Sequence, residues 1–275
     1  ATYYGQLASQ AIVDSGSWLM PKEPTPTAAA IVNFKKRELI QLSHMLAELG
    51  QEKLLRPFLL YLADIANNPS ERTLVARLGA DLGQSALAVR TAKISLRQGT
   101  FLPQTGYPIL AALPPMKIEP ALIHAVARQE SEFNPRAVSS ASARGLMQLL
   151  PQTARKIAKS LRIAYRRDRL FDAWYNIRLG SAYLGQMVEE YGGSYILALA
   201  AYNAGPNRVK RWLRQNGDPR YGAVDPIDWI ELIPITETRN YVQRVMENLQ
   251  VYRWRLKPKL AVLTLLQDLH RNSLP

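Results

Sequence analysis

The sequence predicts a nearly all-helical protein, and two observations carry that prediction. Apolar residues recur at helical spacing from about Thr27 to Gln98, with only polar or glycine breaks between the segments. Later in the chain, beyond a proline-rich stretch, short segments of helical period alternate with turns. In the first half we therefore expect helices over residues 28–49, 52–66, 71–82 and 85–97.

The first half also carries signs of a repeated helix pair. A short helix ending near Asp14 is followed by Pro21–Pro26, whose three prolines predict an extended connector. The pentapeptide Ala47–Gln51 returns in similar form as Ala80–Gln84, 33 residues later. That period is typical of stacked helix pairs, although a chance likeness between two glycine caps would give the same pattern.

A domain boundary is predicted at Gly106–Met116, because Pro114-Pro115 cannot continue a helix. We therefore expect a helical scaffold domain over residues 1–113 and a second domain over 114–275. A final apolar stripe, Leu260–Leu269, must pack against some part of the protein.

Composition limits the classes of function. Of 275 residues, 47% are hydrophobic and 21% charged, which describes an ordered globular protein. There is no cysteine, so disulfides and thiolate metal sites are excluded. His44, His124 and His270 lie far apart in the sequence and make no metal-ligand motif. We expect neither a metal nor another cofactor.

The positive charge lies mainly in the second half. Residues 1–113 carry 11 Lys and Arg against 8 Asp and Glu, whereas residues 114–275 carry 24 against 14. A basic domain suggests a polyanionic partner. Nucleic acid is disfavoured, because no nucleic-acid motif is present and the basic residues are not interleaved with stacking aromatics. A solvated helix face explains much of the densest run, which comprises Arg155, Lys156, Lys159, Arg162, Arg166, Arg167 and Arg169.

No targeting or membrane-spanning segment is predicted. The start, Ala1-Thr-Tyr-Tyr-Gly, lacks the basic and apolar regions of a signal peptide. The longest apolar stretches, Leu54–Ala66 and Tyr107–Pro114, are too short or too rich in proline to cross a bilayer. We expect a soluble protein, and composition leaves its compartment open.

The most informative single residue is Glu130. Pro120 suits the first turn of a helix, and an apolar stripe begins at Leu122 and continues through Val126. One turn further along that stripe stands Glu130, just before Asn134-Pro135 ends the helix. A carboxylate at a core position is expected to have a raised pKa, as a general acid does. The alternative is a charge at the edge of an amphipathic face.

Three separated motifs favour the catalytic interpretation. They are Glu130-Ser131 with Gly145-Leu146-Met147-Gln148, then Ala200–Pro206 (AAYNAGP), then Ile233–Val242 (IPITETRNYV). Together they resemble the soluble lytic transglycosylases. That resemblance implies a helical, superhelical region followed by a catalytic domain related to goose-type lysozyme. Pattern departures are Ile235, where a Phe is more usual, and Leu150, where many relatives have Met.

The resemblance also implies roles for individual residues. Glu130 would be the only catalytic carboxylate, and Tyr202 would lie close to it. From the residues alone, Glu237 is also explained as a first-turn charge behind Thr236 as N-cap, and Gly180 as a close packing contact with another helix. The expected substrate-binding residues are Ser139, Met147, Gln148, Leu150, Tyr202, Asn203, Glu237 and Tyr241.

The function implied is that of a periplasmic peptidoglycan lytic transglycosylase, with peptidoglycan glycan strands as its partner. One glutamate would act first as acid and then as base at the MurNAc–GlcNAc β-1,4 bond, giving 1,6-anhydromuramoyl products. Two alternatives stay open. One is a hydrolytic lysozyme, in which water replaces the C6 hydroxyl, and the other is an inactive protein that binds or assembles the cell wall.

Overall fold

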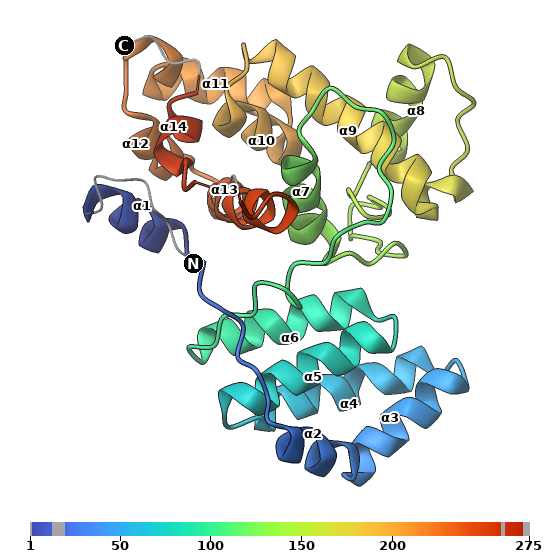
Figure 1. The fold of residues 1–275 in the computed structure, drawn as a ribbon. Helices are drawn as coiled ribbons and strands as arrows, with labels where there is room; N and C mark the ends of the chain where they lie inside the picture. The colour runs from blue at the N-terminus through green and yellow to red at the C-terminus, as the bar shows by residue number, and fades with distance from the viewer. Residues whose placement is uncertain (1, 13–19, 260–261, 272–275) are drawn as a thin grey trace. The chain divides into compact units, whose positions relative to one another are not determined.

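The computed structural model describes residues 2–12, 20–259 and 262–271, and the chain divides into two compact units (Figure 1). The first unit contains α1 (Tyr3–Ile12) and the chain from Leu110 onward, except Glu132–Asn134. The second contains Met20–Ile109 together with Glu132–Asn134. Regular structure within the described residues is helical, apart from isolated β-bridges. The predicted all-α fold is confirmed.

The second unit is built from five helices. Two of them, α4 and α6, match the predicted ranges within one residue. Another, α5, starts two residues early at Pro69, where the Asn68 side chain caps the helix by accepting the Glu71 N–H at 2.9 Å. The bounds are α2 (Ala28–Lys35), α3 (Glu38–Glu48), α4 (Glu52–Ile65), α5 (Pro69–Asp81) and α6 (Ser85–Arg97).

The prediction of one continuous helix over 28–49 is wrong, because the chain breaks between α2 and α3. Arg37 takes an extended conformation there. Phe34 and Ile40 both belong to the same buried cluster. Six residues apart on a straight helix, they would point about 120° away from each other. The break lets both reach one core, and no glycine or proline marks it in the sequence.

The repeated pentapeptide marks two equivalent helix turns. Gly50 and Gly83 both have positive φ, at 65° and 70°. In each copy the following glutamine N–H donates to a carbonyl five residues back, Gln51 to Leu46 and Gln84 to Gly79, both at 2.8 Å. This is the glycine-terminated helix end known as the Schellman motif. It joins α3 to α4 and α5 to α6, so the echo in the sequence reflects two helix pairs.

The first unit is arranged around two buried helices, α7 and α10. Every residue of α7 from Ala121 to Arg128 is buried, and so is every residue of α10 from Tyr195 to Tyr202. A helix that is apolar all round, as α10 is, belongs in an interior. The bounds are α7 (Pro120–Ser131), α8 (Pro151–Ser160), η1 (Asp168–Phe171), α9 (Ala173–Glu190), α10 (Tyr195–Ala204), α11 (Pro206–Asn216), η2 (Pro219–Tyr221), α12 (Pro226–Glu231), α13 (Thr236–Leu256) and α14 (Leu265–Leu269).

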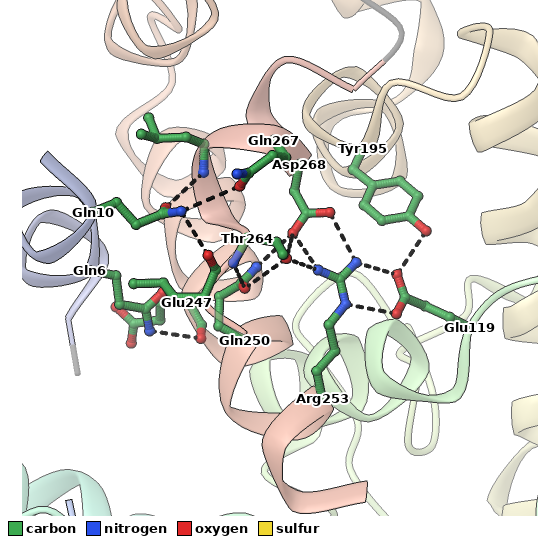
Figure 2. Close-up of polar contacts among 12 residues, drawn as sticks. Gln6, Gln10, Glu119, Tyr195, Glu247, Gln250, Arg253, Thr264, Gln267 and Asp268 are labelled. Atoms are coloured by element: carbon green, nitrogen blue, oxygen red, sulfur yellow. Dashed lines mark hydrogen bonds and ion pairs between the residues drawn. The ribbon is translucent and has the colours of Figure 1, made fainter. Parts of the chain in front are cut away.

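Helix α7 packs along α13, and polar contacts fix how the two helices align. Midway, the buried Arg128 donates to Asn248 Oδ1 at 3.0 Å. At the start of α7, both terminal nitrogens and Nε of Arg253 engage Glu119 and Asp268 (Figure 2). Glu119 contacts Arg253, whereas Arg128, further along α7, contacts the earlier residue Asn248. The two helices therefore run antiparallel.

The cluster around Arg253 gathers four helices at one point. Glu119 precedes α7, Asp268 lies on α14, and the Tyr195 hydroxyl of α10 donates to Glu119 Oε1 at 2.9 Å (Figure 2). Burial alone would raise the pKa of Glu119, but the adjacent Arg253 guanidinium outweighs it and lowers that pKa. Gln250 Nε2 donates to Asp268 Oδ2 at 2.7 Å. The carboxylates of Glu119 and Asp268 are therefore each paired with the Arg253 guanidinium.

Helix α1 belongs with the first unit because its polar groups bond to α13. The Tyr3 N–H donates to Glu247 Oε2 at 2.9 Å, and Gln6 Nε2 donates to the Glu247 carbonyl at 3.1 Å. Apart from Glu132–Asn134, the chain passes from the second unit to the first between Ile109 and Leu110. The predicted domains, 1–113 and 114–275, would group α1 with the scaffold, whereas its contacts group it with the first unit. Whether the two parts are independent domains stays a prediction.

Three smaller expectations concern single segments. Residues 20–27 are non-helical, as expected of a proline-rich connector. The predicted helix end near Asp14 and the start of the stripe at Leu260 fall outside the described residues. The rest of that stripe includes α14, whose Leu265 and Leu269 are buried. Among the helices described, none combines the length and the apolar character needed to cross a membrane.

Replacing Arg253 should test how far the first unit depends on this cluster. In Arg253→Met, Glu119 and Asp268 would be left as uncompensated, largely buried carboxylates. We expect the free energy of unfolding at pH 7 to fall by about 3 kcal/mol, measured by urea denaturation. Arg239→Met on the same helix, which loses only an exposed bond to the Glu231 carbonyl, should cost within about 1 kcal/mol.

The pH dependence of that deficit provides a further check. A carboxyl group with a lowered pKa contributes stability above its unfolded value of 4.5 and loses it as the pH falls through the folded value. The gap between Arg253→Met and the wild type should therefore narrow below about pH 4. An equal gap at pH 7 and pH 3 would contradict the role given to Arg253.

Candidate active site

Glu130 lies in the last turn of α7, where the buried helix reaches a part-exposed position. Its neighbour Ser131 is buried and donates to the carbonyls of Ala127 and Leu146, at 3.1 and 2.8 Å. Burial raises the pKa of Glu130 to about 8, and the negative charge of Glu237 adds to that rise. At neutral pH the carboxyl group therefore holds its proton, as the sequence pattern predicted.

Two buried tyrosines from other helices interact with Glu130. The hydroxyl of Tyr241 on α13 lowers the pKa of Glu130. It thereby favours the ionised carboxylate and opposes the effect of burial. That hydroxyl makes no hydrogen bond of ordinary length to a protein atom. Tyr202 of α10 is also electrostatically coupled to Glu130, while its hydroxyl donates to the Met147 carbonyl at 2.7 Å. Burial raises the pKa of both tyrosines well above 10, so both remain proton donors.

The loop between α7 and α8 is folded over itself and is tied to α9. Arg144 pairs with Val138 on one side and with Leu149 on the other as isolated antiparallel bridges. The fully buried Asn176 of α9 accepts the Met147 N–H at 2.8 Å and donates to the Arg144 carbonyl at 2.9 Å. Gly145 has φ +77°, and a Cβ there would come within 2.3 Å of the Asn176 side chain. Only glycine fits this approach.

The rest of the Gly145–Gln148 motif completes the loop. Gln148 has φ +46°, and its side-chain amide donates to the carbonyls of Ala137 and Gly145 at 3.2 and 2.8 Å. Met147 is fully buried against Gly180, where a Cβ would lie 2.4 Å from the Met147 sulfur. The expectation that Gly180 packs against another helix is therefore wrong, because its close neighbour is this loop. The motif is therefore held by Asn176 and Gly180 of α9 and by the Tyr202 hydroxyl of α10.

The remaining predicted residues lie around this centre at varying depth. The exposed Ser139 accepts the Ala143 N–H at 3.1 Å, and Leu150, the N-cap of α8, is 45% exposed. Asn203 accepts a hydrogen bond from the buried Thr238 hydroxyl at 2.7 Å, which links α10 to α13. Glu237 is exposed in the first turn of α13. Interactions with Glu130 are defined for Tyr202, Tyr241 and Glu237, but Ser139 and Leu150 make no contact with it that the structure defines.

Two details of capping and packing differ from the sequence-based interpretation. The N-cap of α13 is Ile235, so Thr236 is already the first helical residue and its side chain does not cap the helix. Asn176 and Thr238 were not predicted as parts of the site, although each is a polar residue on a buried helix face. That pattern is the signal that could have identified them.

Chemically, the centre offers one protonated carboxyl group flanked by two phenols. Glu237, the only other carboxylate that the structure couples to Glu130, is exposed and stands at a helix start. In the described part of the chain, no three of His, Cys, Asp and Glu gather closely enough to hold a metal ion. One protonated carboxyl group differs from the pair of carboxyl groups that most glycosidases place on either side of the scissile bond.

Comparison with known proteins shows what the part of the chain around Glu130 is similar to. The family model described as the transglycosylase SLT domain matches residues 108–223, which include α7 to α11. The soluble lytic murein transglycosylases of Salmonella typhimurium and Escherichia coli K12 are 39% and 38% identical over 142 residues. That alignment covers 51% of this chain and 21% of either relative.

Solved structures extend the likeness over nearly the whole chain. The 70 kDa soluble lytic transglycosylase of Escherichia coli matches with a TM-score of 0.78 and 26% identity, over 97% of this chain and 43% of that one. An inactive glutamate-to-glutamine mutant of lytic transglycosylase Slt from Pseudomonas aeruginosa matches with a TM-score of 0.77 and 27% identity, over 94% and 42%. The chain spans less than half the length of these relatives. Residues 108–223 are thus similar to the transglycosylase SLT domain, as the motifs around Glu130 indicated.

Proposed function

We propose that the first unit cleaves the MurNAc–GlcNAc β-1,4 bond of peptidoglycan without water, and that Glu130 is the catalytic acid and base. The observation that carries this proposal is the single carboxyl group with its pKa raised to about 8. The names of the relatives, soluble lytic murein transglycosylases, support the same substrate. A solved relative described as an inactive glutamate-to-glutamine mutant supports an essential glutamate in the family.

The first step needs the protonated form of Glu130. Its carboxyl group donates a proton to the glycosidic oxygen, the bond from that oxygen to C1 breaks, and GlcNAc leaves with a free hydroxyl. The carbonyl oxygen of the 2-acetamido group stabilises the positive charge at C1, in the place of a second enzyme carboxylate. Tyr241 favours the ionised Glu130 that this step creates, since its hydroxyl lowers the pKa of the carboxyl group.

The second step uses the carboxylate formed in the first. The C6 oxygen of the same MurNAc attacks C1, and its proton passes to Glu130, which restores the acid. The product is a 1,6-anhydromuramoyl end, and no water is consumed. Acid–base catalysis of this kind contributes about 10²–10⁴-fold to the rate. Because the proposed substrate is peptidoglycan, we propose the periplasm as the location of the reaction.

Analysis of the reaction products tests this function directly. We expect purified protein to release anhydromuramoyl ends from isolated sacculi, identified by a mass lower by one water than the hydrolysed product. Glu130→Gln should release less than a hundredth as much, because the amide has no proton of suitable acidity to donate. Release of hydrated reducing ends would show that the protein is a hydrolytic muramidase. Sacculi that stay intact would favour the alternative of an inactive protein that binds the cell wall.

The rate should also fall on the alkaline side. The acid form of Glu130 is present below its folded pKa and is lost as the pH rises through about 8. We therefore expect kcat/KM on soluble glycan strands to hold up to about pH 8 and then to fall about tenfold per pH unit. A decline centred near pH 4.5 would mean that the carboxyl group is not buried as described.

A further inference from the structure

A cavity of about 800 Å³ lies at the start of α7, within the first unit. Its volume falls in the range of small-ligand sites, about 300–1,000 Å³. The residues of α7 that line it are Pro120 and Ala121, in the first turn of the helix. Glu130 stands at the other end, about 15 Å further along the helix axis. The cavity is therefore separate from the candidate active site.

Apolar side chains from three helix ends form part of the cavity lining. Besides Pro120 and Ala121 on α7, they are Leu256, the last residue of α13, and Val262, which precedes α14. Leu256 is part-exposed, and Val262 is 50% exposed. An apolar group placed against these side chains would remove their surface from water, which favours binding. The lining therefore suits a ligand with an apolar body.

The two carboxylates of the lining are already engaged by the protein. Arg253 donates to Glu119 Oε1 at 2.7 Å and to Asp268 Oδ1 at 2.9 Å (Figure 2). Glu119 also accepts the Tyr195 hydroxyl, and Asp268 accepts the side-chain amide of Gln250. A cationic ligand would have to compete with Arg253 for these acids. The cluster therefore disfavours a cation in the cavity.

Two other cations of the lining, Lys257 and Arg271, make no ion pair with any acid in the described ranges of the chain. Lys257 is exposed as the C-cap of α13. Arg271 is also exposed, and its guanidinium lies over the Tyr195 ring, 4.5 Å from the centroid, which holds it beside the cavity. The uncompensated charge of the lining is thus positive. An ammonium and a guanidinium both bind carboxylates.

We propose that this cavity binds a small carboxylate with an apolar body, of the medium-chain fatty acid type. Its carboxylate pairs with Lys257 and Arg271, and its chain lies against the apolar side chains of α7, α13 and the segment before α14. Arg253 keeps both of its acids, because the ligand brings no competing cation. The ligand joins the ends of three helices. This site goes beyond the proposed function and does not depend on it.

Isothermal titration calorimetry with octanoate tests the site without using enzyme activity. We expect octanoate to bind the full chain at a single site. Octylammonium has the same chain with the opposite charge, and acetate has the same charge without the chain. Both should bind at least tenfold more weakly than octanoate. Equal binding of octylammonium or of acetate would overturn the proposal, and so would a wild-type protein that does not bind octanoate.

Variants of the two cations locate the binding. The double variant Lys257→Gln and Arg271→Gln should bind octanoate about tenfold more weakly, since an exposed cation contributes a few-fold in affinity. Lys259→Gln is the matched control, because Lys259 is exposed two residues further on and does not line the cavity. We expect its Kd to stay within about twofold of the wild type. Equal Kd values for the double variant and the wild type would contradict the proposal.

A variant that fills the cavity provides a check that leaves every charge in place. In Val262→Trp the larger side chain starts from an exposed position, so the fold should tolerate it. We expect octanoate to bind at least tenfold more weakly, while the melting temperature without ligand stays that of the wild type. Octanoate should raise the melting temperature of the wild type but not of this variant. Unchanged affinity would place the octanoate elsewhere and reject the site.

Discussion

The antiparallel packing of α7 on α13 is the constraint on which the site depends. At one end Arg253 binds Glu119 and Asp268, and midway Arg128 binds Asn248, so neither helix can slide along the other without breaking buried polar contacts. This alignment brings the last turn of α7 to the first turns of α13. Glu130 consequently meets Tyr241 in an environment with little water, and its raised pKa follows from where the helix ends.

That placement costs stability, and the surrounding structure offsets it. A carboxyl group with its pKa raised from 4.5 to about 8 opposes folding increasingly as the pH rises between these values, since the ionised form is disfavoured inside. Most polar groups of the loop beside Glu130 are hydrogen-bonded, whereas the buried Tyr241 hydroxyl and Arg144 Nε are not. The Asn176 side chain pairs with the Met147 N–H and the Arg144 carbonyl. The Ser131 hydroxyl bonds α7 to the same loop through the Leu146 carbonyl. Unfavourable burial falls on Glu130, and positive φ occurs in the loop at Ser142 as well as at Gln148.

Sequence reasoning reached what depends on local chemistry and missed what depends on tertiary packing. The stripe leading to Glu130 and the glycine ends at Gly50 and Gly83 follow from spacing and φ preference, so they could be predicted. The break at Arg37 could not, because it arises from two side chains sharing one core. Asn176 and Arg144 were also missed, since their partners are carbonyls and a ring that only the folded loop brings near.

Direct titration of Glu130 tests the central claim most sharply. The carboxyl signal can be followed by carbon-13 NMR of protein labelled at glutamate, and assigned by its loss in Glu130→Gln. The account predicts a midpoint near pH 8 for this one group, well above that of an ordinary glutamate. A midpoint near 4.5 would contradict it, since Glu130 would then be ionised at neutral pH and could not be the acid.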